Sequence, residues 1–111
     1  MAIHFKTHTP NGLLAAFKKA IDDGHVATWS YDSVNDFTHT AEQWKNLAWL
    51  RPKAKSEELV FSIIKPKGRN ISSEIYAIYH GRFIETMLRH CDSLFTDADA
   101  TAFPKEDDLV S

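Results

Sequence analysis

The stretch TPNGLLAAFKKAIDDG, residues 9–24, decides the fold, because it defines one complete amphipathic helix within a chain of 111 residues. Thr9 suits the capping position and Pro10 the first helical position, where a missing N–H costs no hydrogen bond. On a helical wheel the apolar side chains fall within an arc of roughly 160°, and the charged ones fall opposite. Gly24 follows at the point where a glycine ends many helices. The sequence therefore predicts a one-sided helix over residues 10–23.

A second amphipathic stretch predicts a longer helix over residues 73–95. Ser72 or Ser73 can cap it, and Glu74 follows closely, as in a capping box. Its apolar side chains fill an arc of roughly 180°. Both helices therefore have one face to bury and one face for solvent.

The segments around these helices alternate apolar and polar residues or are rich in β-branched residues, which predicts strands. The predicted strands cover residues 3–8, 25–31, 37–44, 47–51 and 59–64. Pro52 is expected to close the fourth and to mark an edge or an end, because proline lacks the N–H that a central strand needs. The alternation directs Phe5, Trp29, Phe37 and Phe61 toward the helices.

The resulting order, β-α-β-β-β-β-α, predicts an α+β fold. We expect a two-layer sandwich, in which an antiparallel sheet of about five strands carries both helices on one face. Residues 1–95 form a single domain in this interpretation. Residues 96–111 are acidic and rich in small side chains, and we expect them to be a mobile tail.

The composition indicates whether the chain can form a core and in which cellular compartment we expect it. An apolar content of 43 % is enough for a core, and the single cysteine, Cys91, cannot form an internal disulfide. One cysteine in a small domain favours a reducing compartment, so we expect a cytoplasmic protein. No apolar run is long enough for a signal peptide or a membrane span, so no membrane association is expected.

The sheet face away from the helices is the first candidate for binding. By strand parity it presents hydroxyl and histidine side chains, together with one large aromatic side chain that would be an exposed anchor. These candidate partner-binding residues are Trp44, His4, Lys6, His8, Thr38 and Thr40. A plain solvated sheet face is the alternative explanation of the same pattern.

Basic residues gather in the hairpin that spans residues 51–69. Residues 45–69 hold seven basic and two acidic side chains, whereas the rest of the chain holds six basic and thirteen acidic ones. The candidate phosphate-binding residues are Arg51, Lys53, Lys55, Lys65, Lys67 and Arg69. Such cations could grip a nucleic-acid backbone. They could equally protect an edge strand and keep two turns soluble.

Among the six histidines, His80 is the most informative, because it falls in the middle of the second helix's apolar arc. It is either a buried histidine with one hydrogen-bond partner or a general base in a pocket. The histidine and cysteine spacings match no zinc motif, so neither a metal site nor a cofactor is predicted. Opposite this arc, Arg82, Glu85 and Arg89 fit an ion-pair ladder in solvent.

No enzyme signature occurs in the sequence. The leading hypothesis is a non-catalytic interaction protein that binds a protein partner, with self-association as one form of that. The alternatives are nucleic-acid binding through the hairpin at 51–69 and a small enzyme that uses a pocket near His80.

Overall fold

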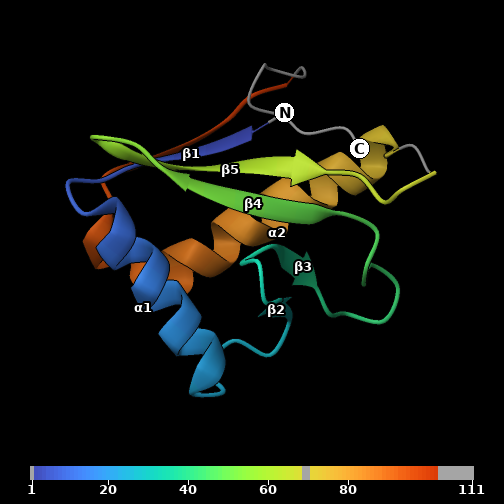
Figure 1. Ribbon diagram of the computed structural model, residues 1–111, viewed down its shortest axis with the longest axis horizontal. Coiled ribbons are helices and arrows are strands. Elements are labelled where there is room, and N and C mark those ends of the chain that lie inside the picture. Colours follow the sequence, from blue (N-terminus) through green and yellow to red (C-terminus); the bar gives the residue numbers. More distant parts are fainter. Residues whose placement is uncertain (1, 69–70, 103–111) are drawn as a thin grey trace.

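The computed structural model describes residues 2–68 and 71–102 and shows a six-stranded, fully antiparallel sheet with two α-helices. In space the strands lie in the order β2-β3-β4-β5-β1-β6. Figure 1 shows both helices on the same side of β1, β5 and β4. The elements are β1 (Ala2–Lys6), α1 (Pro10–Asp22), β2 (Trp29–Tyr31), β3 (Phe37–His39), β4 (Trp49–Ala54), β5 (Glu58–Ile64), α2 (Ser73–Cys91), the 3-10 turn η1 (Asp92–Leu94) and β6 (Asp97–Ala100). The predicted α+β class is confirmed.

Both predicted helices are present, and their ends follow the local signals. Pro10 opens α1, and Gly24, with φ of +80°, follows its end. The side chain of Ser72 accepts the backbone N–H of Ile75 at 3.2 Å and so caps α2. The sequence predicted α2 to run to residue 95, but it ends at Cys91 and continues as the short η1 turn.

Aromatic rings form the core between the sheet and the helices. Phe5, Phe37 and Phe61 are fully buried and Trp29 is 2 % exposed, which confirms the predicted core-facing side of these strands. Phe83 of α2 contacts all four rings at centroid separations of 4.6–6.1 Å. The edge-to-face geometry of these pairs adds to the free energy gained from burial alone.

The predicted strand over residues 37–44 is wrong beyond His39. Trp44 lies instead in a turn, half-buried and packed against the core. The hydroxyl of Tyr79, from α2, donates to the Trp44 carbonyl and accepts the backbone N–H of Leu47 at 3.2 Å. These bonds draw the connection toward α2, so Trp44 is not the exposed anchor on the far sheet face that parity predicted.

Of the two expectations for Pro52, an edge or an end, the end is wrong, because β4 continues through Pro52 to Ala54. Pro52 pairs with Phe61 of β5. On its other side, within the described residues, β4 pairs with β3 at Leu50 alone. A residue whose backbone nitrogen faces that open side loses no ladder hydrogen bond, which is where sheets tolerate proline.

The sixth strand lies within the segment that was expected to be a tail. Residues 97–100 pair with β1, and the N–H groups of Thr96 and Thr101 donate to the Lys6 and Ala2 carbonyls at 2.9 Å. The order is therefore β-α-β-β-β-β-α-β, and the sheet includes part of residues 96–111. Residues 103–111 of the predicted tail lie outside the described residues.

None of the helices in the described ranges 2–68 and 71–102 is long and apolar enough to span a bilayer.

Candidate functional site

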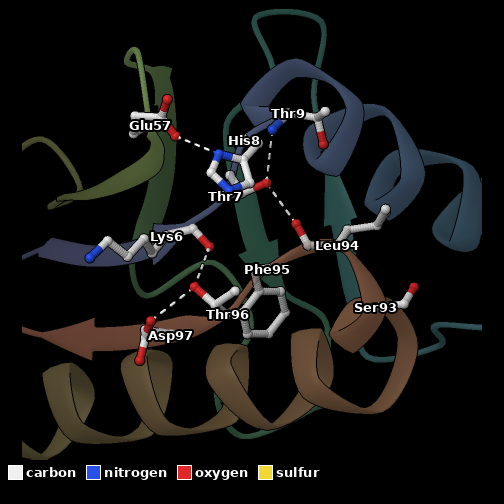
Figure 2. A pocket seen from close by; sticks show the side chains of 10 residues that line it. All are labelled: Lys6, Thr7, His8, Thr9, Glu57, Ser93, Leu94, Phe95, Thr96 and Asp97. Carbon is white, nitrogen blue, oxygen red and sulfur yellow. Dashed lines mark hydrogen bonds and ion pairs between the residues drawn. The ribbon is translucent and has the colours of Figure 1, made fainter.

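A hollow of about 520 Å³ lies where three distant segments meet at the end of β1. Figure 2 shows it between the β1–α1 connection, the turn after β4 and the segment that joins α2 to β6. We call it the β1-end hollow. It is lined by Lys6, Thr7, His8, Thr9, Glu57, Ser93, Leu94, Phe95, Thr96 and Asp97.

Backbone and hydroxyl hydrogen bonds fix the walls of the β1-end hollow. The hydroxyl of Thr7 donates to the Leu94 carbonyl at 2.6 Å, joining residues 87 positions apart. The same oxygen accepts the N–H of Thr9 at 3.1 Å. These bonds appear as dashed lines in Figure 2. Because they span separate elements, the shape of the hollow depends on the whole fold.

The hollow combines apolar side chains with a polar rim. Phe95 is half-buried and meets the Phe5 ring edge-to-face at 5.1 Å, while Leu94 stays 36 % exposed. On the rim, His8 Nδ1 lies 2.8 Å from the Glu57 carboxylate, and both side chains are exposed. The hollow thus offers an apolar surface framed by groups of both charges.

A second hollow of about 540 Å³ adjoins the first and shares three of its residues. His4 lies at its wall, with Nδ1 3.3 Å from the Glu58 carboxylate. The structure therefore brings His4, Lys6 and His8, three of the predicted partner-binding residues, to neighbouring hollows. The second hollow is lined by His4, Lys6, Lys55, Ser56, Glu57, Glu58, Asp97 and Asp99.

The other predicted partner-binding residues lie elsewhere, and the far sheet face is not the exposed polar surface that was expected. Thr38 is 8 % exposed, and its hydroxyl donates to the Ala48 carbonyl at 2.8 Å. Ser62 is also buried, together with the apolar Val60 and Ile64 of the same strand. Thr40 is exposed, but it follows β3, and its hydroxyl donates to the carbonyl of Ala27.

The basic hairpin is partly neutralised within the fold. Arg51 makes two hydrogen bonds of 2.9 Å to the buried Asp36 carboxylate, which raise the pKa of Arg51. Lys53 and Lys55 also have interaction partners. Lys65 is half-buried and Lys67 is exposed. The sixth candidate, Arg69, lies outside the described residues.

His80 is buried and borders a small pocket. Its Nδ1 lies 2.8 Å from the Tyr76 carbonyl, so the N–H at Nδ1 donates and Nε2 keeps its lone pair. Among the residues that the structure describes, that Nε2 has no hydrogen-bond partner, and burial lowers the pKa of His80. The pocket measures about 320 Å³ and is lined by Ser73, Tyr76, Ala77, His80, Ala100, Thr101 and Ala102.

Sequence reasoning missed a further site, a pocket of about 270 Å³ between α2 and the strands β2 and β3. We call it the α2 pocket. Arg82, Glu85 and Arg89 line it, although the sequence suggested an ion-pair ladder for them. No ion pair joins these three within the described ranges, so the ladder is not formed. Their helical spacing was visible in the sequence, but the strand residues opposite them were not.

Metal or thiol chemistry has little support in residues 2–68 and 71–102. In these ranges no three histidine, cysteine or acidic side chains are grouped to hold a metal ion. Cys91 is buried, and burial raises the pKa of its thiol, which keeps the less nucleophilic protonated form.

Comparison with known proteins adds no functional assignment: no protein-family model, curated protein or solved structure matches the chain.

Proposed function

We propose that the chain is a non-catalytic interaction protein that binds a protein partner through the β1-end hollow. The observation that carries this proposal is the accessible apolar surface of Leu94 and Phe95 inside a polar frame. Protein interfaces commonly place an apolar anchor in such a pocket and surround it with a polar rim. A cytoplasmic location is part of the proposal and rests on the single cysteine.

The hollow favours a partner segment with an apolar side chain and polar neighbours. Leu94 and Phe95 would contact the apolar side chain, and the exposed His8 and Glu57 would meet the polar groups beside it. A second copy of this chain is one such partner. Sedimentation velocity over a range of concentrations distinguishes that case from binding to another protein.

The two exposed leucines of the helical segment 73–94 offer a matched test. Leu94 lines the β1-end hollow, whereas Leu88, 49 % exposed on α2, does not. Partners are captured with the full chain and identified, and their affinities are measured by isothermal titration calorimetry. We expect Leu94→Ser to weaken binding by roughly tenfold or more, as loss of an interface anchor does, and Leu88→Ser to leave it unchanged. Equal affinity of the two variants for every captured partner would refute this use of the hollow.

Nucleic-acid binding through the hairpin at 51–69 is the first alternative, and the Arg51–Asp36 pair speaks against it, because a cation already paired gains less from a phosphate. A steep decrease in RNA or DNA affinity with added salt would favour this alternative.

A small enzyme is the second alternative. It is supported by the pocket and the unpartnered Nε2 of His80, but the described lining adds only hydroxyl groups to that base.

A further inference from the structure

The strand β6 forms one edge of the sheet and is largely open to solvent. Within residues 2–68 and 71–102 it pairs with β1 alone, and three of its four residues are exposed. An edge strand presents backbone N–H and C=O groups with which a further strand can pair. Many proteins bind an extended peptide by adding it to such an edge as a strand. The outer side of β6 is therefore a candidate surface for a partner of this kind.

The register of β1 and β6 shows which backbone groups face outward. The N–H of Thr101 donates to a β1 carbonyl at 2.9 Å, and the register continues from there along β6. In an antiparallel ladder every second residue directs its backbone toward the neighbouring strand. The backbones of Asp97, Asp99 and Thr101 therefore face β1. Those of Ala98 and Ala100 face outward, and we call their N–H and C=O groups the β6 edge.

The surface on one side of the β6 edge is acidic. Ala98 packs against the core, so the exposed side chains of Asp97 and Asp99 lie on the sheet face away from the helices. Both line the second hollow, where four acidic and two basic side chains give a formal net charge of −2 with His4 neutral. Opposite charges on neighbouring strands stabilise their pairing. A strand added next to the two aspartates should therefore carry basic side chains on this face.

The surface on the other side of the β6 edge is an apolar pocket. It is the pocket of about 320 Å³ beside His80, which residues of α2 and the end of β6 line. Ala77 of α2 and Ala100 are exposed there, next to the half-buried Tyr76. Successive side chains of a strand point to opposite faces of the sheet. A strand that fits both faces of the β6 edge thus alternates basic residues with small apolar ones.

A second copy of this chain does not match the β6 edge. Aligning Ala98 of one copy with Ala98 or Ala100 of the other places an aspartate of one opposite an aspartate of the other. Like charges directly opposite each other destabilise a strand pair. Charged edges commonly prevent pairing between copies in this way, and the sign of the charge then determines which strand can bind.

We propose that the β6 edge binds an extended, basic segment of another protein as an additional strand of the sheet. The backbone of that segment pairs with Ala98 and Ala100, and its basic side chains lie beside Asp97 and Asp99. Its small apolar side chains enter the pocket between β6 and α2. The proposal does not depend on the apolar anchors of the β1-end hollow, so it adds a second interaction surface to the protein.

Amide hydrogen exchange of the free, full chain tests whether the β6 edge is open. NMR should show rapid exchange at Ala98 and Ala100 and slower exchange at Asp97 and Asp99, whose amides face β1. Protection of the two alanine amides at every protein concentration would mean that another segment of this chain already pairs with the edge. Protection that increases with concentration would mean that a second copy does. Either result would overturn the proposal.

A synthetic heptapeptide that alternates lysine and valine is the probe for binding. The same peptide with glutamate in place of lysine is the control, and both are titrated into the ¹⁵N-labelled full chain. We expect saturable binding of the lysine peptide alone, with slower exchange at Ala98 and Ala100 and no change at Tyr31 of β2, the opposite edge strand. Absence of binding, equal binding of both peptides, or binding without protection of the two alanine amides would refute strand addition.

Neutral variants of the aspartates test the charge match. The double variant Asp97→Asn, Asp99→Asn keeps the size of both side chains, and we expect it to raise the Kd of the lysine peptide about fivefold. Glu42→Gln removes an exposed carboxylate outside the second hollow and should leave that Kd unchanged. An unchanged Kd in the double variant would also overturn the proposal.

The two proposed interaction surfaces can fail separately. Leu94→Ser should bind the lysine peptide as the unaltered chain does, because Leu94 lines neither the second hollow nor the pocket between β6 and α2.

Discussion

At the scale of single residues, Tyr79 shows how one side chain can determine a long connection. The sequence placed it correctly on the apolar arc of the second helix, and it is fully buried. Its hydroxyl then bonds the backbone at Trp44 and Leu47, which ends the regular alternation after His39. The alternating pattern of residues 37–44 does not show the contact with the Tyr79 hydroxyl. The strand predicted from that pattern was therefore too long.

Replacing Tyr79 with phenylalanine should therefore destabilise the protein with little change in volume. We expect Tyr79→Phe to lower the free energy of unfolding by about 1–3 kcal/mol, because it leaves the Leu47 N–H and the Trp44 carbonyl without their partner. Urea unfolding monitored by circular dichroism measures this. Tyr31→Phe is the control, since it removes only a hydroxyl bonded to the exposed Asp22, and it should have a smaller effect. Equal losses would contradict the assigned role of Tyr79.

At the scale of elements, the sequence predicted the elements that are determined by their own residues. It did not predict the elements that depend on pairing with a distant segment. The helix α1 was predictable because Pro10 and the apolar period lie within it and Gly24 follows directly after its end. The strand β6, Asp97–Ala100, is acidic and has low β-propensity, and among the described strands it pairs with β1 alone. The same holds for the sites: residues close in the sequence were predicted together, and residues from distant elements were not. His4 and Lys6 lie in β1 and His8 follows two residues after its end, so they stay together, whereas the α2 pocket needs β2, β3 and α2.

Removing β6 should weaken the sheet if the strand is part of the folded unit. We compare a chain that ends at Phe95 with one that ends at Ala102. The shorter chain should unfold at a lower urea concentration, because β1 loses an entire neighbour. Hydrogen exchange should also accelerate at the β1 amides but not in β4. Unchanged stability and exchange would restore the interpretation of residues 97–100 as a tail.

At the scale of the whole molecule, two buried histidines link stability to pH. Burial lowers the pKa of both His39 and His80 below the ordinary value of 6.5. In the unfolded chain these rings bind protons as the pH falls through about 6.5, whereas in the native protein they stay neutral to lower pH. Their contribution to stability is therefore fully present above that pH and decreases below it.

The free energy of unfolding should consequently decrease between about pH 7.5 and about pH 5.5. His80→Leu replaces a buried titratable ring with an apolar side chain, so its stability should change less over the same interval. Urea titrations at both pH values provide the measurement. Val34→Ala, at an exposed position without a titratable group, serves as the control and should keep the full decrease. A His80→Leu protein with the same pH dependence as the control would rule out His80 as a source.

The position of β1 has a consequence for the synthesis of the chain. Of the described strands this one comes first in the sequence, but it lies between β5 and β6, and a hydrogen bond joins Ala2 to Thr101, 99 positions later. During translation β1 must wait for both neighbours, with Ile3 and Phe5 still uncovered by the completed core. Pairing over such distances also slows folding. The strand β1 therefore gains its second neighbour only after residues 97–101 have been synthesised.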